Sequence, residues 1–290
     1  MTIVLGLMAA TRRSATPTMP DTASLLLCAD TMATYSAPSP FIYPLTTTVA
    51  TGPYQGKIYP LPHGFYCAFC DDYHWSHQIA TELYGRMANL KPSSPGFRDE
   101  IKVEIENSFE YAFLWLRPEV LRNDVGIVLD EYLKGPLDPN LRADAQAALQ
   151  NAARNIPAEL IIAGQTPRGP LLLRANGTEI REITEYAASG GPVESAINWF
   201  RFRGQQSSMS IPRSFFHMLE AKKFCELDPT VGRDHQFVLI PPTGPPSVLQ
   251  DRGALSSNWI SEFGLRPTNV LDTPDRRISF ETSFNLKLTP

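Results

Sequence analysis

Cysteine is scarce in this sequence, with four residues in a chain of 290. Their positions, Cys28, Cys67, Cys70 and Cys225, are spread widely, and no secretory signal is recognisable, which favours reduced thiols over a disulfide framework. The first residues fit a signal peptide poorly, because the apolar run is short and Arg12-Arg13 follow it instead of preceding it. We therefore expect a cytoplasmic protein.

Clusters of positive charge and long apolar runs are also missing. The 26 Lys and Arg residues are scattered, the net charge is -4 and the pI is near 5.8, so we expect neither nucleic acid nor an anionic membrane as a partner. The longest apolar runs, at 24–29 and 171–173, are far shorter than the ~20 residues of a membrane-spanning helix. The composition, 43% hydrophobic and 19% charged, is typical of a soluble globular protein.

Apolar segments near the start of the chain predict strands. Residues 3–8 and 25–29 are apolar and partly β-branched, which indicates two adjacent buried strands. Residues 11–22 between them are rich in Ser, Thr, Pro and Arg and predict a long exposed hairpin loop. Two more short strands in hairpin order are expected at 56–61 and 65–70.

The apolar period then changes to that of a helix. Apolar residues recur at helical spacing between residues 79 and 90, which predicts a first helix. A second helix is expected from 98 to 117, where Pro118 should kink or stop it. An Ala-rich third helix is expected at 141–154.

The second half of the chain repeats the order of strands followed by helices. Strands are expected at 158–164, 169–174 and 179–183, then a tight loop at 187–191, helices at 193–203 and 212–227, and a last strand at 237–240. Hairpin-length connections between strands, with helices grouped in pairs, favour antiparallel sheets stacked face to face with helices outside. A parallel doubly wound sheet would alternate strand and helix one for one.

Thr2 follows the initiator methionine, so removal of Met1 would make it the N-terminal residue. A free α-amine has a pKa of about 7.7–8.0, so it can take the proton from the hydroxyl of its own residue. One residue would then serve as both nucleophile and base. Threonine is common at the second position, and an ordinary strand start explains it equally well.

Six short segments occur in the same order as similar segments of a known protein family. They are Thr2–Gly6, Ala29–Thr34, Lys57–Leu61, Leu160–Gly164, Ser189–Gly190 and Leu227–Gly232. Together the set resembles the proteasome β-subunit and its bacterial relatives, which are N-terminal nucleophile hydrolases. The resemblance covers roughly residues 2–240. It implies an α+β fold, a four-layer αββα sandwich of two antiparallel sheets, over residues 1–240.

The resemblance also implies a threonine-type endopeptidase that needs no cofactor. Thr2 would be the nucleophile, Lys57 the cation that favours the neutral amine, and Asp30 the carboxylate that orients the lysine. Ser189 and Asp228 match the supporting network, and the N–H of Gly190 is a candidate oxyanion donor. The chain departs from the family at Met32, where an arginine is common, and at Val231, where a serine is expected.

Two other functions remain open at this level. The first is a subunit of the same fold that has lost its chemistry and serves ring assembly. The second is a zinc-binding module built on Cys67, Cys70, His74 and His77, which have metal-ligand types at short spacing. Strand residues three apart point to opposite faces, so Cys67 and Cys70 should diverge. We therefore expect no metal site.

Residues 241–290 are expected to form an extension outside the sandwich. The stretch Pro241–Pro246 contains four prolines and predicts a stiff linker that ends the last strand. Residues 277–286 alternate with a period of two, so the extension should dock on its own subunit or add a strand to a neighbour. The expected partners are a peptide or unfolded-protein substrate and further copies in a homo-oligomeric ring; the sequence does not tell whether an ATPase feeds it.

Overall fold

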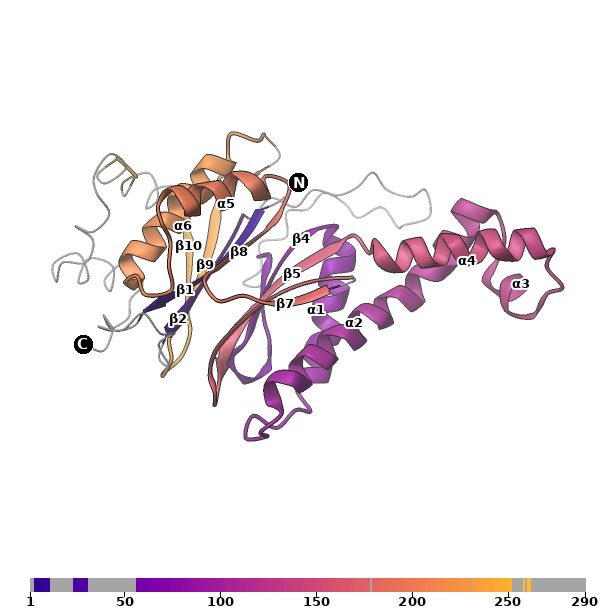
Figure 1. Cartoon of the computed structure of the whole chain (residues 1–290), viewed down its shortest axis with the longest axis horizontal. Coiled ribbons are helices and arrows are strands. Elements are labelled where there is room, and N and C mark those ends of the chain that lie inside the picture. Colours follow the sequence, from indigo (N-terminus) through magenta and orange to yellow (C-terminus); the bar gives the residue numbers. More distant parts are fainter. Residues whose placement is uncertain are drawn as a thin grey trace.

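The computed structural model describes residues 3–10, 23–30, 56–177, 179–229, 231–251, 258, 260 and 261. Two antiparallel five-stranded sheets lie face to face, with helices on the outer side of each (Figure 1). The fold class is α+β, as the strand and helix order predicts. Thr2, the loop expected at 11–22, residues 31–55 and most of the expected C-terminal extension lie outside the described residues.

The first sheet has the strand order β10-β9-β2-β1-β8. Its central hairpin pairs β1 with β2 along their whole length, from Val4 opposite Ala29 to Ala10 opposite Ala23. The two expected neighbouring strands are therefore confirmed. The strands of this sheet are β1 (Ile3–Ala10), β2 (Ala23–Asp30), β8 (Tyr186–Gly190), β9 (His235–Ile240) and β10 (Ser247–Asp251).

The second sheet has the order β3-β4-β5-β6-β7, so each strand pairs with the next along the chain. The β5–β6 hairpin closes at Thr166 opposite Gly169, which leaves the two-residue turn that Pro167-Arg168 indicate. The strands are β3 (Ile58–Pro60), β4 (Tyr66–Asp71), β5 (Ala158–Thr166), β6 (Gly169–Asn176) and β7 (Glu179–Glu182).

Helices cover the outer faces in two groups. Helices α5 and α6 pack on the first sheet and α1 and α2 on the second, while α3 and α4 extend beyond the sandwich beside the end of α2 (Figure 1). Within the described residues, no helix is both long and apolar enough to cross a membrane. The helices are α1 (Tyr73–Met87), α2 (Phe97–Val120), α3 (Leu129–Lys134), α4 (Pro139–Arg154), α5 (Val193–Phe202) and α6 (Ile211–Cys225), with short turns η1 (Pro62–Gly64) and η2 (Leu121–Val125).

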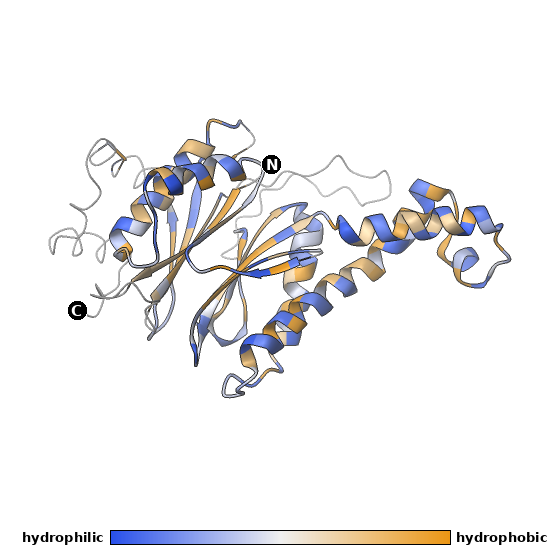
Figure 2. Cartoon of the chain, viewed as in Figure 1, coloured by the Kyte–Doolittle hydropathy of each residue, from blue (hydrophilic) through white to orange (hydrophobic). Residues whose placement is uncertain are grey.

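Strand β1 is buried on both faces because it lies between a helix layer and the other sheet. Leu5 and Leu7 belong to the cluster shared with α5 and α6, whereas Val4 and Met8 belong to the cluster between the sheets. Figure 2 shows these hydrophobic strands in the middle of the molecule. Alternation along the strand thus sends successive side chains into two cores.

One local prediction is wrong in part and another is wrong. Pro118 does not stop α2, which continues to Val120 and then into the π-helical turn η2. A proline within a helix lacks the N–H that would bond the carbonyl four residues earlier, and its ring crowds that carbonyl. Here that residue is Leu114, which is half exposed, so water can solvate the carbonyl.

The expected loop at 187–191 is instead strand β8, which pairs with β1 from Ile3 opposite Gly190 to Leu7 opposite Tyr186. Its small residues have weak strand propensity, but Ala187, Ala188 and Ser189 are buried beside β1. Burial against the neighbouring strand therefore decides the conformation of this segment.

The first sheet continues past the boundary expected at residue 240. Strand β10 follows Pro246 directly and pairs with β9, with Ser247 opposite Leu239 and Asp251 opposite His235. The proline-rich segment therefore forms a hairpin connection and does not lead away from the sandwich. Five residues of the expected extension belong to the sheet, while the division of the chain at 240 otherwise stays a prediction.

Candidate active site

Four of the expected site residues, Asp30, Lys57, Ser189 and Gly190, lie at one end of the sandwich. In the first sheet β1 begins beside Gly190, at the end of β8, and β2 ends with Asp30 opposite His235. In the second sheet, β4 ends at Asp71 opposite Ala158, where β5 begins. The contacts that join the sheets at this end include two between side chains, Lys57 with Asp30 and Arg174 with Ser189.

The first contact is a buried ion pair between Asp30 and Lys57. The Lys57 Nζ donates to Asp30 Oδ1 at 2.7 Å, and the two residues are 4% and 0% exposed. Asp30 ends β2 of one sheet and Lys57 precedes β3 of the other, so the pair spans the interface between the sheets. Sequence reasoning named both residues, and the structure brings them together.

The backbone around Lys57 is held by the side chain of Gln236 on β9. The N–H of Ile58 donates to Gln236 Oε1 at 3.2 Å, and a Cβ at Gly56 would lie only 1.7 Å from the same oxygen. On the other side, the N–H of Phe69 donates to the Lys57 carbonyl at 3.0 Å. A side chain at position 56 would thus displace the Gln236 amide from Ile58 and disturb the backbone beside Lys57.

The surroundings of Lys57 favour its neutral form more than water does. Burial lowers the pKa of the Lys57 ammonium, and the adjacent Asp30 carboxylate opposes this effect without cancelling it. An amine with a lowered pKa sits closer to the range in which it can exchange protons near neutrality. Asp30 therefore holds Lys57 in place and favours its charged form against the effect of burial.

Asp30 is also bound from the opposite side. Its Oδ2 accepts the N–H of Gly232 at 2.8 Å, and the Gly232 carbonyl accepts Lys222 Nζ at 2.6 Å. Lys222 is fully buried, and its Nζ also lies 3.1 Å from Glu226 Oε1. The position of the carboxylate is therefore fixed by a chain of contacts that reaches α6.

Glu226 is the residue of α6's C-terminal end at which this series of contacts finishes. Its carboxylate also lies 2.7 Å from His235 Nε2 and 2.9 Å from Lys223 Nζ. Burial alone would raise the pKa of Glu226, but the hydrogen bonds from His235, Lys222 and Lys223 hold it at about 2. The carboxylate is thus charged at any pH at which the protein would work.

The second contact between the sheets joins Arg174 on β6 to Ser189 on β8. Arg174 Nε donates to Ser189 Oγ at 3.0 Å, and its terminal nitrogen donates to the Glu159 carboxylate at 3.3 and 3.2 Å. Ser189 is completely buried, and its neighbour Gly190 has a φ of 115°, in the region that favours glycine. Neither Arg174 nor Glu159 was identified from the sequence.

Two expected site residues are placed less directly. Thr2 lies outside the described residues, one position before Ile3, whose register partner is Gly190. Asp228 lies in the turn between α6 and β9, where its N–H donates to Cys225 and its carbonyl accepts the N–H of Val231. The same turn carries Gly232, which binds Asp30. Val231, at the position of the family's serine, is buried in the apolar cluster with α6.

The four residues of the alternative zinc module do not converge. Cys67 faces the helices in one apolar cluster and Cys70 faces the other sheet in a different one. His77 packs its ring against Tyr73, with centroids 5.7 Å apart. All four cysteines are free thiols, and burial raises the pKa of Cys67 and Cys70, which disfavours the thiolate that zinc needs.

Cys70 does approach Asp71 and Glu159, with potential ligand atoms within 4.8 Å of one another. The Glu159 carboxylate is already paired with Arg174, which places a fixed positive charge beside any cation. This arrangement argues against a metal centre at these three residues.

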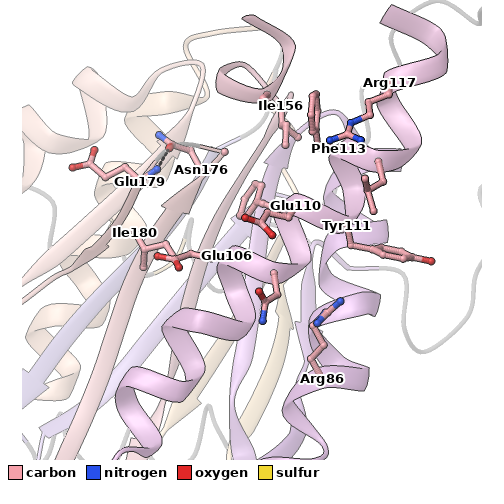
Figure 3. A pocket seen from close by; sticks show the side chains of 15 residues that line it. Arg86, Glu106, Glu110, Tyr111, Phe113, Arg117, Ile156, Asn176, Glu179 and Ile180 are labelled. Atoms are coloured by element: carbon pink, nitrogen blue, oxygen red, sulfur yellow. Dashed lines mark hydrogen bonds between the residues drawn. The ribbon is translucent and has the colours of Figure 1, made fainter. Parts of the chain in front are cut away.

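A cavity of about 700 Å³ lies elsewhere, between α2, the end of α4 and the β6–β7 hairpin (Figure 3). Glu106, Glu110 and Arg117 of α2 and Glu179 of β7 line it, and the Arg117 guanidinium lies 5.0 Å from the centre of the Phe113 ring. Neither Asp30 nor Lys57 contributes to this cavity, so its residues are distinct from those of the candidate active site.

Two solved structures match this architecture along most of the chain. Anbu (ancestral beta-subunit) from Yersinia bercovieri aligns with a TM-score of 0.57 at 10% identity, over 91% of this chain and 93% of that one. The chain has the fold of Anbu. An Anbu (Gly-1) mutant from Hyphomicrobium sp. strain MC1 aligns with a TM-score of 0.54 at 10% identity, over 91% of this chain and 94% of that one.

The Anbu structures support the proteasome-like sandwich that the six sequence segments imply. No protein-family model and no curated protein matches the sequence. At 10% identity the Anbu likeness concerns the fold alone, so any chemistry must be argued from the residues of this chain.

Proposed function

We propose that the protein is a proteasome-like threonine peptidase in which Thr2, exposed by removal of Met1, is the nucleophile. The observation that carries the proposal is the buried Lys57–Asp30 pair at the end of the sandwich where β1 begins. A buried ion pair is costly to maintain for stability alone. A cation beside the start of β1 has the chemistry that an N-terminal nucleophile requires.

In the proposed reaction the Thr2 hydroxyl oxygen attacks the peptide carbonyl carbon while the α-amine of Thr2 takes the hydroxyl proton. The C–N bond then breaks, and the leaving amine takes that proton from the ammonium. Water attacks the resulting ester, and the carboxylic acid leaves as the Thr2 hydroxyl is restored. Lys57 stabilises the neutral amine and the developing alkoxide, and the Gly190 N–H is the proposed oxyanion donor.

Hydrolysis of fluorogenic peptides by purified variants tests this proposal. Thr2→Ala and Lys57→Ala should each lower kcat/KM by about a thousandfold or more, since a nucleophile or its activator is lost. Thr2→Ser retains a hydroxyl and should retain measurable activity. Lys102→Ala is the matched control, because Lys102 pairs with Glu182 at the surface. Residual activity of Thr2→Ala within tenfold of the parent would refute the assignment.

We also propose a homo-oligomeric ring. The matched structure is described as a beta-subunit, and closed symmetric assembly is the usual outcome for soluble homo-oligomers. The helices expose large apolar side chains that suit such contacts, including Trp115 on α2 and Phe202 on α5, which are 58% and 75% exposed. Native mass spectrometry that gives only monomer across a hundredfold concentration range would contradict this proposal.

One observation favours a second candidate, a ring subunit that has lost its chemistry. Val231 stands where the resemblance leads us to expect a serine, and it is buried among apolar residues, so no hydroxyl is available at that position. Under this alternative Met1 would be retained. Val231→Ser then separates the candidates: it should raise activity in a working peptidase and have no effect in an assembly subunit.

A further inference from the structure

We propose that Arg174 is a positioning residue for the proposed hydrolysis, holding the Ser189 hydroxyl so that it donates its proton toward the start of β1. This inference rests on the proposed function. It assigns a role to a charged side chain on β6, a strand that contributes nothing to the resemblance.

A serine hydroxyl has one proton to donate and two lone pairs to accept with. Arg174 Nε–H occupies one of those lone pairs at 3.0 Å, and a guanidinium can only donate. The Ser189 proton must therefore be directed to another group. Since Ser189 is fully buried, that group belongs to the protein or to a bound substrate.

The sheet register indicates where the group lies. Ser189 is opposite Val4, and Gly190 is opposite Ile3, so Ser189 is beside the point at which the chain enters β1. The proposed nucleophile is the residue before Ile3. A Ser189 hydroxyl that acts as a donor here would stabilise the neutral α-amine, and its proton must turn away from the amine's single lone pair when that lone pair takes the proton of the Thr2 hydroxyl.

Glu159 fixes the direction of Arg174. Its carboxylate oxygens accept from the terminal nitrogen of Arg174 at 3.3 and 3.2 Å, which leaves Nε aimed at Ser189. Arg174 and Glu159 side chains are 32% and 23% exposed, so their electrostatic effects are partly screened by solvent. Among the described residues, other titratable or charged groups at this end include Asp30, Lys57, Cys70, Asp71 and His235.

The pH dependence of kcat/KM for peptide hydrolysis tests the inference, because its acidic limb reports the pKa of the essential base in the free enzyme. Arg174→Met removes a positive charge and the bond that orients Ser189, so the limb should move to higher pH by ~0.5 unit. Glu159→Gln keeps Arg174 but removes a negative charge, so the limb should move to lower pH by ~0.5 unit. A general loosening of the structure would not produce shifts of opposite sign.

Two further variants complete the experiment. Arg181 lies directly opposite Arg174 on β7 but pairs with Glu179 near the surface, so Arg181→Met is the matched control and should leave the limb in place. In a Ser189→Ala background, Arg174→Met should shift the acidic limb by at most half of the shift that it causes when Ser189 is present, because the hydroxyl that Arg174 orients is gone. If Arg174→Met does not fold, Glu159→Gln still gives a shift to lower pH as the predicted outcome.

An unchanged limb in Arg174→Met, or shifts of the same sign in Arg174→Met and Glu159→Gln, would overturn the inference while the proposed function stands. A parent enzyme that hydrolyses no peptide and retains Met1 would overturn the proposed function and this inference with it. The two failures are therefore distinguishable from the behaviour of the parent protein alone.

Discussion

Asp30 holds Lys57 at 2.7 Å across the interface between the two sheets, and both side chains are almost completely buried. Burial lowers the pKa of Lys57, and the Asp30 carboxylate is the largest of the contributions that raise it again. The pair is the polar centre of the candidate active site.

Asp30→Asn should lower activity and narrow its pH range. Without the carboxylate the pKa of Lys57 falls further, so the ammonium is lost at a lower pH and the alkaline limb of kcat/KM should move downward. We expect the rate at neutral pH to fall by about a hundredfold. A pH–rate profile checks this, and an alkaline limb that stays in place or moves upward would contradict the role given to Asp30.

Lys222→Met should destabilise the fold by about 3 kcal/mol, because it leaves the Gly232 carbonyl and part of the Glu226 carboxylate without their buried partner. Lys223→Met is the matched control: Lys223 binds the same carboxylate but its side chain is 25% exposed. Its loss should cost less than about 1 kcal/mol. Urea unfolding at one fixed protein concentration gives both values, and equal losses would refute a special role for Lys222.

Glu226→Gln should make stability less sensitive to acid. The folded pKa of Glu226 is about 2, below the ordinary value of 4.5, so its contribution is fully present above pH 4.5 and is lost as the pH falls toward 2. The shift corresponds to a free energy on the order of 3 kcal/mol. The free energy of unfolding, measured between pH 4.5 and 2, should therefore fall less steeply in the variant. Parallel curves would contradict the prediction.

Gly6→Val should destabilise the sandwich by about 1–3 kcal/mol, because a side chain there would crowd the opposite sheet. A Cβ at Gly6 would lie 2.9 Å from Ile161 and 3.0 Å from Leu172, both on the opposite sheet. Gly85→Ala is the matched control, since a Cβ at this exposed position in α1 meets nothing within 4 Å. It should stabilise by up to about 1 kcal/mol. Thermal unfolding of both variants distinguishes these effects by sign.

The sequence predicts strands and helices where burial follows a regular period. The runs at 3–8 and 158–164 are mostly apolar and buried, and they form the inner strands β1 and β5 of the two sheets. Strand β8 is missed because its alanines, serine and glycine have little strand propensity of their own, and their pairing with β1 spans more than 180 residues. Pro118 is misjudged because the cost of a helical proline depends on the exposure of the freed carbonyl.

The candidate site, like strand β8, is predictable only in part, because contacts between distant segments of the chain determine it. Asp30 and Lys57 lie in segments that carry the family resemblance, so they can be named before their contact is known. Arg174 and Lys222 carry no such signal: one interrupts an apolar strand and the other lies within a helix with several charged residues. Their roles depend on Ser189 and Gly232, which only the folded chain brings within hydrogen-bond distance.

The intact mass of the purified protein, before and after treatment with a threonine-reactive covalent inhibitor, tests the central claim most directly. We expect the mass of residues 2–290, which lacks Met1, and the addition of one inhibitor per chain at Thr2. Thr2→Ala should lose the addition, and Lys57→Ala should slow it strongly. A parent protein that retains Met1 would contradict the account. So would a Thr2→Ala variant that takes up the inhibitor as well as the parent does.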